Sequence, residues 1–423
     1  MRYTLFFRCK RTCVLLAFLL SSTTPVVAAE NTGTTLTLKK ALASTLAQNP
    51  QLYQYRFSTE VLNAQKQSSA LRPALALELE VENFAGSGSN QGLDAAETTL
   101  ALSSAIELGR KRQARLSYAD ARINQMEWEQ QAATLDVLGA LTEIYIEGLA
   151  TQANIQLAEE SLALSQSLLK TVKTRSARGA TPEAEVMRAQ AALTRAEIRL
   201  AALQEHFKRQ KVQLVRFWGE TTAKFATLEG NLYNFGATNS FDQLYARVQT
   251  SPAIRVLASE ARIRDAQVTL ARANGRSDLS WRVGVKRFEE TGESAFTAGL
   301  SIPLFSGKRS NGEVKAALAN RNAVDYAQKD RLLQLHARLF EAWSLRKQSI
   351  TAANLTQKVA IPALEKALRL TTEGFENGRY RYLDLIAAQE ELLASKQALI
   401  DAATTALVSQ ALIEKLTSEA LNP

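Results

Sequence analysis

The sequence predicts an α+β membrane protein, mostly α-helical, in which one chain carries two structural repeats. The first observation is that short residue pairs recur along the chain at a nearly constant offset of about 200 residues. The second is that two regions change from a helical period to a period of two. The third is that each of these regions precedes a helical stretch far longer than the helices of globular domains.

The repeat is defined by residue pairs in both halves of the chain. Three of them recur in order: Asn49-Pro50 as Ser251-Pro252, Ala64-Gln65 as Ala266-Gln267, and Ala189-Gln190 as Ala388-Gln389. The first repeat spans residues 30–218 and the second residues 251–423. We expect each to fold as helix, strand, strand, very long helix, turn and helix. A mixed region at 219–250 connects them and is expected to wrap around the middle of the helices.

Residues 1–29 have the pattern of a secretory signal peptide. A positive segment is followed by the apolar stretch Val14–Leu20 and the small-residue cleavage site Val27-Ala28-Ala29. Both cysteines, Cys9 and Cys13, lie inside it, so we expect the mature chain to hold no disulfide and no thiolate metal site. Cys13 follows charged residues rather than small apolar ones, so no lipid-modified N-terminus is expected.

The charge of the chain does not indicate nucleic-acid binding. The net charge is +9, and four cations of the signal segment account for part of it, which leaves 9 − 4, or about +5. This excess is spread along helices that also carry carboxylates, without a basic stripe interleaved with aromatic residues. No run of 18 or more apolar residues follows the signal segment, so a membrane span would have to be a β-barrel wall.

The helices at the start of the first repeat are expected at residues 37–48 and 51–71. Asn49-Pro50 separates them, and Arg72-Pro73 ends the second, because proline lacks an amide donor and restricts the residue before it.

The first strand pair, residues 75–108, alternates apolar and polar side chains. The apolar side chains of its first strand are expected to face lipid: Leu75, Leu77, Leu79 and Val81. The carboxylates between them are expected to face a lumen: Glu78, Glu80 and Glu82. About ten residues of such alternation fit a strand of a membrane barrel. The alternative is a half-buried strand of an ordinary sheet in a soluble protein.

The second strand pair, residues 279–304, repeats this scheme with the opposite charge. Its expected lipid-facing residues are Leu279, Trp281, Val283, Leu300 and Ile302. Arg282 and Lys286 are expected to face the lumen, where they partly offset the glutamates. The charged set could give a weak cation preference, or it could serve only as a polar surface in contact with water.

Four strands are too few to close a barrel, since the smallest single-chain barrels have about eight. An unpaired sheet edge cannot face lipid, because its amide and carbonyl groups would lack hydrogen-bond partners. The sequence therefore predicts a barrel that several chains share.

The long helices are expected at residues 110–177 and 312–375. The first would be about 100 Å long and needs a coiled-coil partner. It ends at Arg178–Pro182, and the chain returns through residues 183–218. The second turns at residues 376–380 and returns through 380–416. Pro362 is expected to kink or break the second long helix.

At this point the pattern resembles the TolC-like outer-membrane factor family over essentially the whole mature chain. Three segments are similar to its cobalt–zinc–cadmium efflux type: Glu80-Val81-Glu82-Asn83, the stretch Ile106–Arg112, and Ile302-Pro303-Leu304-Phe305. The resemblance implies a homotrimer with a shared 12-stranded β-barrel in outer-membrane lipid and a long periplasmic α-helical coiled-coil barrel. It also implies a Gram-negative outer membrane as the location. The implied partners are a periplasmic adaptor (a membrane fusion protein) and an inner-membrane RND pump.

The resemblance also implies roles for residues at the helical turns. The turns would form the tip that meets the adaptor: Arg178, Gly179, Ala180 and Thr181, with Asn377, Gly378, Arg379 and Tyr380. Asp384 is similar to the first of two aspartates that constrict the tunnel in the family, and Glu185 occupies its place in the first repeat. Ala387 stands at the second position, so a double aspartate ring is absent. The alternative for Asp384 is a solvated carboxylate on a coiled-coil surface.

No motif for catalysis, cofactor binding or metal binding accompanies these features. The two histidines, His206 and His336, are not part of any cluster with ligand spacing, and no nucleophile elbow or phosphate loop is present. The predicted function is therefore a passive exit channel of a tripartite efflux pump, with divalent heavy-metal cations as the expected cargo. The alternatives are the same duct for drug efflux or type I protein secretion, and a soluble periplasmic coiled-coil scaffold.

Overall fold

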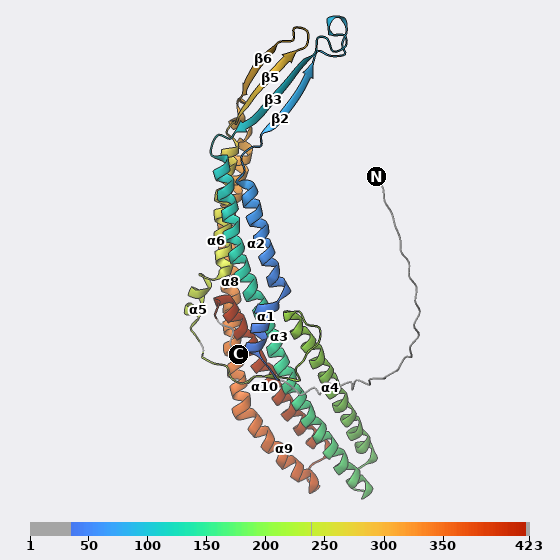
Figure 1. Ribbon diagram of the computed structural model, residues 1–423. Helices are drawn as coiled ribbons and strands as arrows, with labels where there is room; N and C mark the ends of the chain where they lie inside the picture. The colour runs from blue at the N-terminus through green and yellow to red at the C-terminus, as the bar shows by residue number, and fades with distance from the viewer. Residues whose placement is uncertain (1–34, 238, 420–423) are drawn as a thin grey trace, which may run out of the picture.

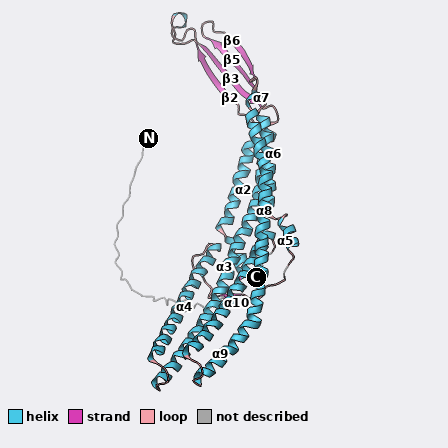
Figure 2. Cartoon of the chain, turned by 180° about the vertical axis from the view of Figure 1, so that it is seen from behind, coloured by secondary structure: helices cyan, strands magenta, loops and turns pink. Residues whose placement is uncertain are grey.

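The computed structural model describes residues 35–237 and 239–419, which form a very elongated molecule. A four-stranded sheet lies at one end, long helices run away from it, and two helical hairpins end at the opposite tip (Figure 1). Figure 2 shows the same division from behind, with every long strand in the sheet and helices elsewhere. The expected export signal at residues 1–29, with Cys9 and Cys13, lies outside the described residues.

The two repeats follow the same order of elements. The first contains α1 (Leu38–Gln48), α2 (Pro50–Ser69), β2 (Ala76–Glu82), β3 (Glu97–Ile106), α3 (Lys111–Ala177) and α4 (Glu183–Val215). The second contains α6 (Pro252–Asn274), β5 (Leu279–Phe288), β6 (Ser294–Ser301), α7 (Ser306–Arg309), α8 (Asn311–Leu355), α9 (Ile361–Glu376) and α10 (Tyr382–Thr417). Shorter elements are β1 (Thr35–Thr37), β4 (Thr227–Glu229), α5 (Phe241–Val248) and the 3₁₀ turns Gly88–Asn90 and Arg216–Trp218.

The first two helices are separated at Asn49, as the sequence predicts. The Asn49 side-chain oxygen accepts a hydrogen bond from the Leu52 amide at 3.1 Å, and Pro50 occupies the first helical position. Asparagine caps a helix N-terminus in this way, and proline there loses no intrahelical bond. Asn49 therefore ends α1 and starts α2 without a connecting loop.

The helix α3 is 67 residues long, about 100 Å at 1.5 Å per residue. It packs against α2, α4, α6 and α10, so several neighbouring helices cover its surface. This packing stabilises a helix whose length alone would not. Within the described part of the chain, no helix combines the length and the apolar character that crossing a bilayer requires.

The second long helix is interrupted near Pro362, as predicted, and the interruption begins a turn earlier. Residues Thr356–Ala360 form a π-helical turn between α8 and α9, and Pro362 lies in the first turn of α9. Proline cannot donate to the carbonyl four residues before it, and a π-turn is a common way for a helix to continue past such a defect. The two helices therefore remain end to end.

The strands form one antiparallel sheet in the order β2-β3-β5-β6, so β2 and β6 are its edges. The strands are shorter than the sequence suggests. Asn83 and Ala85 have positive φ angles of 57° and 53°, which ends β2 at Glu82. Leu75 and Ile302, expected within the strands, lie one residue outside β2 and β6, and Pro303 prevents β6 from continuing.

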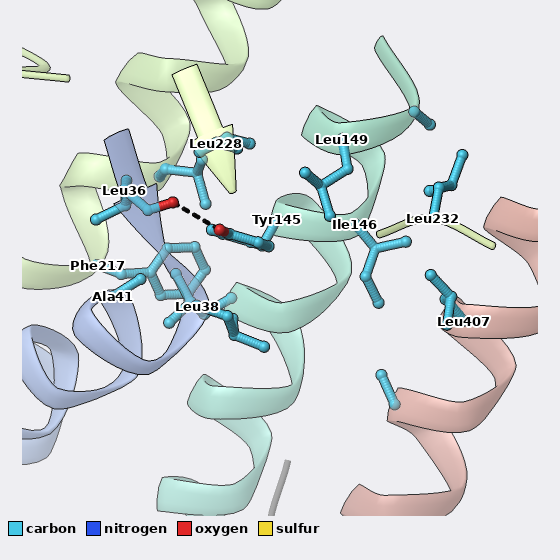
Figure 3. Close-up of a cluster of buried hydrophobic side chains, with 14 of the residues drawn as sticks. Leu36, Leu38, Ala41, Tyr145, Ile146, Leu149, Phe217, Leu228, Leu232 and Leu407 are labelled. Carbon is cyan, nitrogen blue, oxygen red and sulfur yellow. Dashed lines mark hydrogen bonds between the residues drawn. The ribbon is translucent and has the colours of Figure 1, made fainter. Parts of the chain in front are cut away.

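A hydrophobic core lies halfway along the molecule, where the connecting region crosses the helices. Strands β1 and β4 pair in parallel there, a pairing that was not predicted from the sequence. Tyr145 of α3 is fully buried, and its hydroxyl lies 2.7 Å from the Leu36 carbonyl oxygen (Figure 3). The same hydroxyl lies 2.6 Å from the Glu229 carbonyl oxygen. Burial raises the pKa of Tyr145 to about 12, so the phenol stays neutral. The buried tyrosine thus holds both strands against α3.

Candidate functional site

The register of the sheet gathers the predicted charged residues on one face. Glu78 and Glu80 on β2 lie on the same face as Arg282 on β5, although β3 separates the two strands. The Arg282 guanidinium spans β3 and lies 3.2 Å from Glu78 and 2.7 Å from Glu80. Lys286 likewise lies 2.7 Å from Glu82 and 2.6 Å from Glu97 of β3. The four carboxylates of this face thus share two cations.

The opposite face of the sheet is apolar and exposed. The pairing aligns Leu79, Leu100, Val285 and Phe296 across all four strands. The exposed fraction is 69% for Leu79 and 90% for Phe296, and Leu77, Val81, Val283 and Leu300 are also exposed. Leu279 and Trp281, expected on this face, are half-buried. A contiguous apolar face of this kind marks a surface that meets another protein or a membrane.

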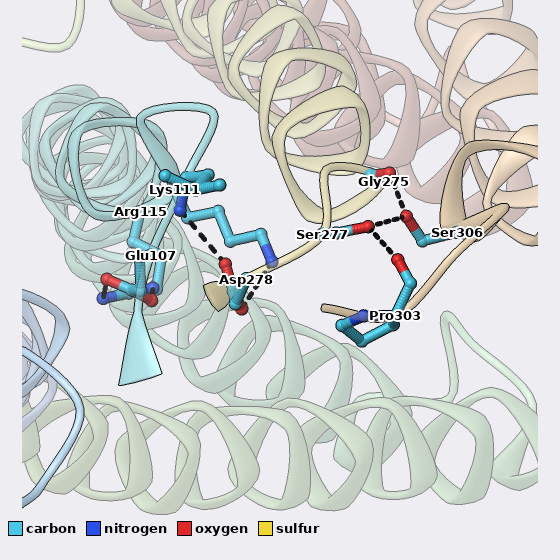
Figure 4. Close-up of polar contacts among 9 residues, drawn as sticks. Glu107, Lys111, Arg115, Gly275, Ser277, Asp278, Pro303 and Ser306 are labelled. Carbon is cyan, nitrogen blue, oxygen red and sulfur yellow. Dashed lines mark hydrogen bonds and ion pairs between the residues drawn. The ribbon is translucent and has the colours of Figure 1, made fainter. Parts of the chain in front are cut away.

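Polar contacts at the base of the sheet fix it to the helices (Figure 4). Asp278 precedes β5; its carboxylate lies 2.7 Å from the Lys111 ammonium and accepts a hydrogen bond from the Leu108 amide at 3.1 Å. Glu107 pairs with Arg115, which also donates to the Ser69 and Leu71 carbonyls. These contacts join the segment after β3 to α2 and to the segment before β5. The segment Ile106–Arg112 thus contacts Asp278, a contact that its sequence alone does not predict.

In the second repeat, serine hydroxyl groups make the contacts at the base of the sheet. Ser277 donates to the Pro303 carbonyl at 2.5 Å and lies 2.7 Å from the Ser306 hydroxyl. Ser306 in turn donates to the Gly275 carbonyl at 3.2 Å. The segment that enters β5 and the segment that leaves β6 are therefore held together. No sequence motif indicated this contact.

The two helical turns lie together at the far tip. Gly179 and Gly378 have φ angles of 70° and 74°, which suit glycine at a helix C-terminus. Arg175, one turn before the first of them, donates to the Phe375 carbonyl at 2.8 Å and the Glu376 carbonyl at 3.1 Å. Its guanidinium also lies 4.7 Å from the centre of the Phe375 ring. Arg175 thus binds the C-terminal end of α9, a contact that no sequence pattern predicts.

Asp384 lies at the start of α10, where it caps the helix. Its carboxylate accepts a hydrogen bond from the Arg381 backbone amide at 2.9 Å, and the Arg381 side chain lies at 3.4 Å. The backbone hydrogen bond, followed by the hydrogen bond and charge of the side chain, lowers the pKa of the Asp384 carboxyl. The Asp384 carboxyl group is therefore ionised at neutral pH.

Glu185 occupies the corresponding place in the first turn of α4. Burial, and secondarily the charge of Glu185, raises the pKa of Tyr382 in the first turn of α10. The two predicted acidic residues are thus located at the tip, next to the turns. Among the described residues, no group of three or more histidine, cysteine or acidic side chains could hold a metal ion.

The chain is similar to known proteins over most of its length. The model of the outer membrane efflux protein family matches residues 41–220 and 244–419. The cobalt-zinc-cadmium resistance protein CzcC of Cupriavidus metallidurans is 26% identical over 294 residues, which cover 69% of this chain and 70% of that protein. The nickel-cobalt-cadmium resistance protein NccC of Alcaligenes xylosoxydans is 25% identical over 352 residues, which cover 82% of this chain and 76% of that protein.

Solved structures share the same fold. CusC superposes with a TM-score of 0.76 at 16% identity, over 90% of this chain and 92% of that one. The outer membrane protein VceC of Vibrio cholerae superposes with a TM-score of 0.75 at 21% identity, over 91% and 97% of the two chains. The arrangement of sheet, helices and turns is therefore that of these proteins.

Proposed function

Because the chain belongs to the outer membrane efflux protein family, we propose that it is the passive exit duct of a tripartite efflux pump for divalent heavy-metal cations. The family match covers both repeats. The cargo is inferred from the relatives, which are named as resistance proteins for cobalt, zinc and cadmium and for nickel, cobalt and cadmium. Energy would come from an inner-membrane RND pump, and a periplasmic adaptor would connect that pump to the tip formed by residues 178–181 and 377–380.

The observation that carries the proposal is the sheet with one apolar face and one ion-paired face. Its edges β2 and β6 have no partner among the described strands. Open edges are not tolerated in lipid, so three chains would pair β2 of one with β6 of the next into a barrel of 12 strands. The apolar face would then meet lipid, and Glu78, Glu80, Glu82, Arg282 and Lys286 would line the lumen.

The assignment of the two faces predicts how single cysteines react. Leu79→Cys is expected to react with a lipid-soluble maleimide and to resist a membrane-impermeant one, because Leu79 belongs to the apolar face. Glu80→Cys, one residue away on the other face, should react with the impermeant reagent. Labelling of purified trimers in vesicles, read by mass, measures this. The opposite pattern would reverse the two faces.

Asp384 is proposed to ring the periplasmic entrance, three copies per trimer, with Glu185 beside it. Like charges held in a narrow constriction repel, and cations relieve that repulsion. Asp384→Asn is expected to raise single-channel conductance in planar bilayers and to weaken block by divalent cations. Asparagine still accepts the hydrogen bond from Arg381, so this variant separates charge from helix capping. Conductance and block equal to those of the wild type would remove Asp384 from the gate.

Cargo is tested by a deletion strain. Loss of the channel is expected to increase sensitivity to cobalt, zinc or cadmium, and the cloned chain should restore resistance. Sensitivity to detergents and dyes with unchanged metal tolerance would instead assign the duct to drug efflux.

A further inference from the structure

A cavity of about 300 Å³ lies where the second repeat begins, among four helices. The first turn of α6 forms one side, and α3, α8 and the end of α10 form the others. Ser251, Arg331, Arg338, Lys415 and Leu416 are among the residues that line it. This volume is many times what a single water molecule needs, so it is large enough for a small polyatomic ion.

The repeat explains why the cavity exists. In the first repeat Asn49 caps α2, and its side-chain amide also donates to the Phe217 carbonyl at 2.8 Å. Ser251 is the counterpart of Asn49, and Leu416 is the counterpart of Phe217 at the offset that relates Ala189-Gln190 to Ala388-Gln389. Serine is too short to bridge the same gap. The gap that the Asn49 side chain bridges in the first repeat is therefore left as a cavity beside Ser251 in the second repeat.

Ser251 has a hydroxyl without a partner. The residue is 4% exposed, it caps no amide of α6, and its hydroxyl oxygen has no hydrogen-bond partner among the described residues. A buried polar group left unpaired destabilises a protein, because it has lost its hydrogen bonds to water. Ser251 lies in the wall of the cavity, and an unpaired group at such a place indicates that something else supplies the missing hydrogen bond.

The charges around the cavity are mainly positive. Arg331, Arg338 and Lys415 bring three cations, and Asp136 is the one carboxylate among the lining residues. Asp136 is already paired with Lys415 at 2.7 Å. Arg338 has no ion pair with any described residue. The first turn of a 23-residue helix adds a partial positive charge and the amide of Ala253, which comes too early to bond within the helix.

We propose that this cavity binds a small tetrahedral oxyanion, inorganic phosphate or sulfate. Arg331 and Arg338 would neutralise it, and Ser251 with the Ala253 amide would donate hydrogen bonds, which are the contacts that such anions receive at helix N-termini. A lipid headgroup at the rim of the sheet is too far away. The helix α6 spans about 35 Å between this cavity and the segment that enters β5.

The test uses the full mature channel in detergent. Isothermal titration calorimetry and thermal unfolding with sodium phosphate, against sodium chloride at equal ionic strength, are expected to show saturable binding and a phosphate-specific rise in Tm. Arg331→Gln and Arg338→Gln should each weaken binding about tenfold, and Ser251→Ala about fivefold. Lys315→Gln removes a charge from α8 away from the cavity and should leave binding unchanged.

Ser251→Asn copies the first repeat and should abolish binding while preserving or raising Tm without phosphate. Equal Tm shifts in the wild type and in the arginine variants would mean a general salt effect and overturn the proposal. A second result would also overturn the proposal: the arginine variants have a lower Tm than the wild type, and phosphate does not change the Tm of the wild type. That result would mean that a carboxylate of a neighbouring chain fills the cavity. Channel conductance is measured separately, so failure of this site leaves the proposed function intact.

Discussion

Phe296→Arg is expected to abolish assembly of the chain into outer-membrane trimers. Phe296 is 90% exposed and is the third residue of β6, on the apolar face of the sheet. An arginine on the lipid face of a barrel destabilises it by up to about 4 kcal/mol, with the cost falling toward the membrane interfaces, and a trimer would carry three copies. The amount of heat-modifiable trimer in the outer-membrane fraction measures the effect.

The matched control is Thr297→Arg, one residue along the same strand. Thr297 points to the ion-paired face, opposite Gly284. A lumen-facing arginine stays in water, so trimers should form and only conductance should change. Equal tolerance of both substitutions would contradict the assignment of the apolar face to lipid.

Arg346→Met is expected to lower the Tm of the channel more than any other single substitution of a cation on α8. The Arg346 guanidinium is buried at 3% exposure, donates to the Phe235 carbonyl, and donates to the Ala237 carbonyl at 3.2 Å. It thereby holds residues 235–237 of the connecting region against α8. Burial lowers its pKa, and the charge of the buried Glu414 opposes that shift.

Removing one member of a buried charged network destabilises a protein by about 3–5 kcal/mol, because the other member is left uncompensated. Lys347→Met changes the exposed neighbouring cation and should destabilise the protein by at most about 0.5–1 kcal/mol through its contact with Trp343. Thermal unfolding of both variants in the same detergent compares them. Equal Tm values would show that Arg346 does not hold the connecting region.

The periodic parts of this fold can be predicted from the sequence because one physical rule governs each of them. The alternation of apolar and polar side chains predicted the two faces of the strands. The register of the sheet brings Glu78, Glu80 and Arg282 together on one face. The absence of proline predicted α3 to within a residue at its start. Glycine at 179 and 378 marked the turns because only glycine adopts positive φ at no steric cost.

The parts that were missed depend on contacts between distant segments. Arg175 binds the end of α9, about 200 residues away, and nothing around Arg175 in the sequence distinguishes it from a solvated helix residue. Tyr145 joins β1 and β4, two strands of three residues that are too short to show a period. The end of β2 was misplaced by a residue or more because the alternating pattern does not reveal the positive φ angles at Asn83 and Ala85 that interrupt the strand.

The central claim is that β2 of one chain pairs with β6 of the next. Cysteine pairs between Glu78 or Glu80 on β2 and Thr297 or Gly299 on β6 test it directly. Within one chain β3 and β5 separate these strands by about 14 Å, too far for a disulfide, and the only native cysteines lie in the expected signal segment. At least one pair is expected to give covalent trimers on non-reducing gels after oxidation. If every pair leaves only monomers, the chains do not share a barrel.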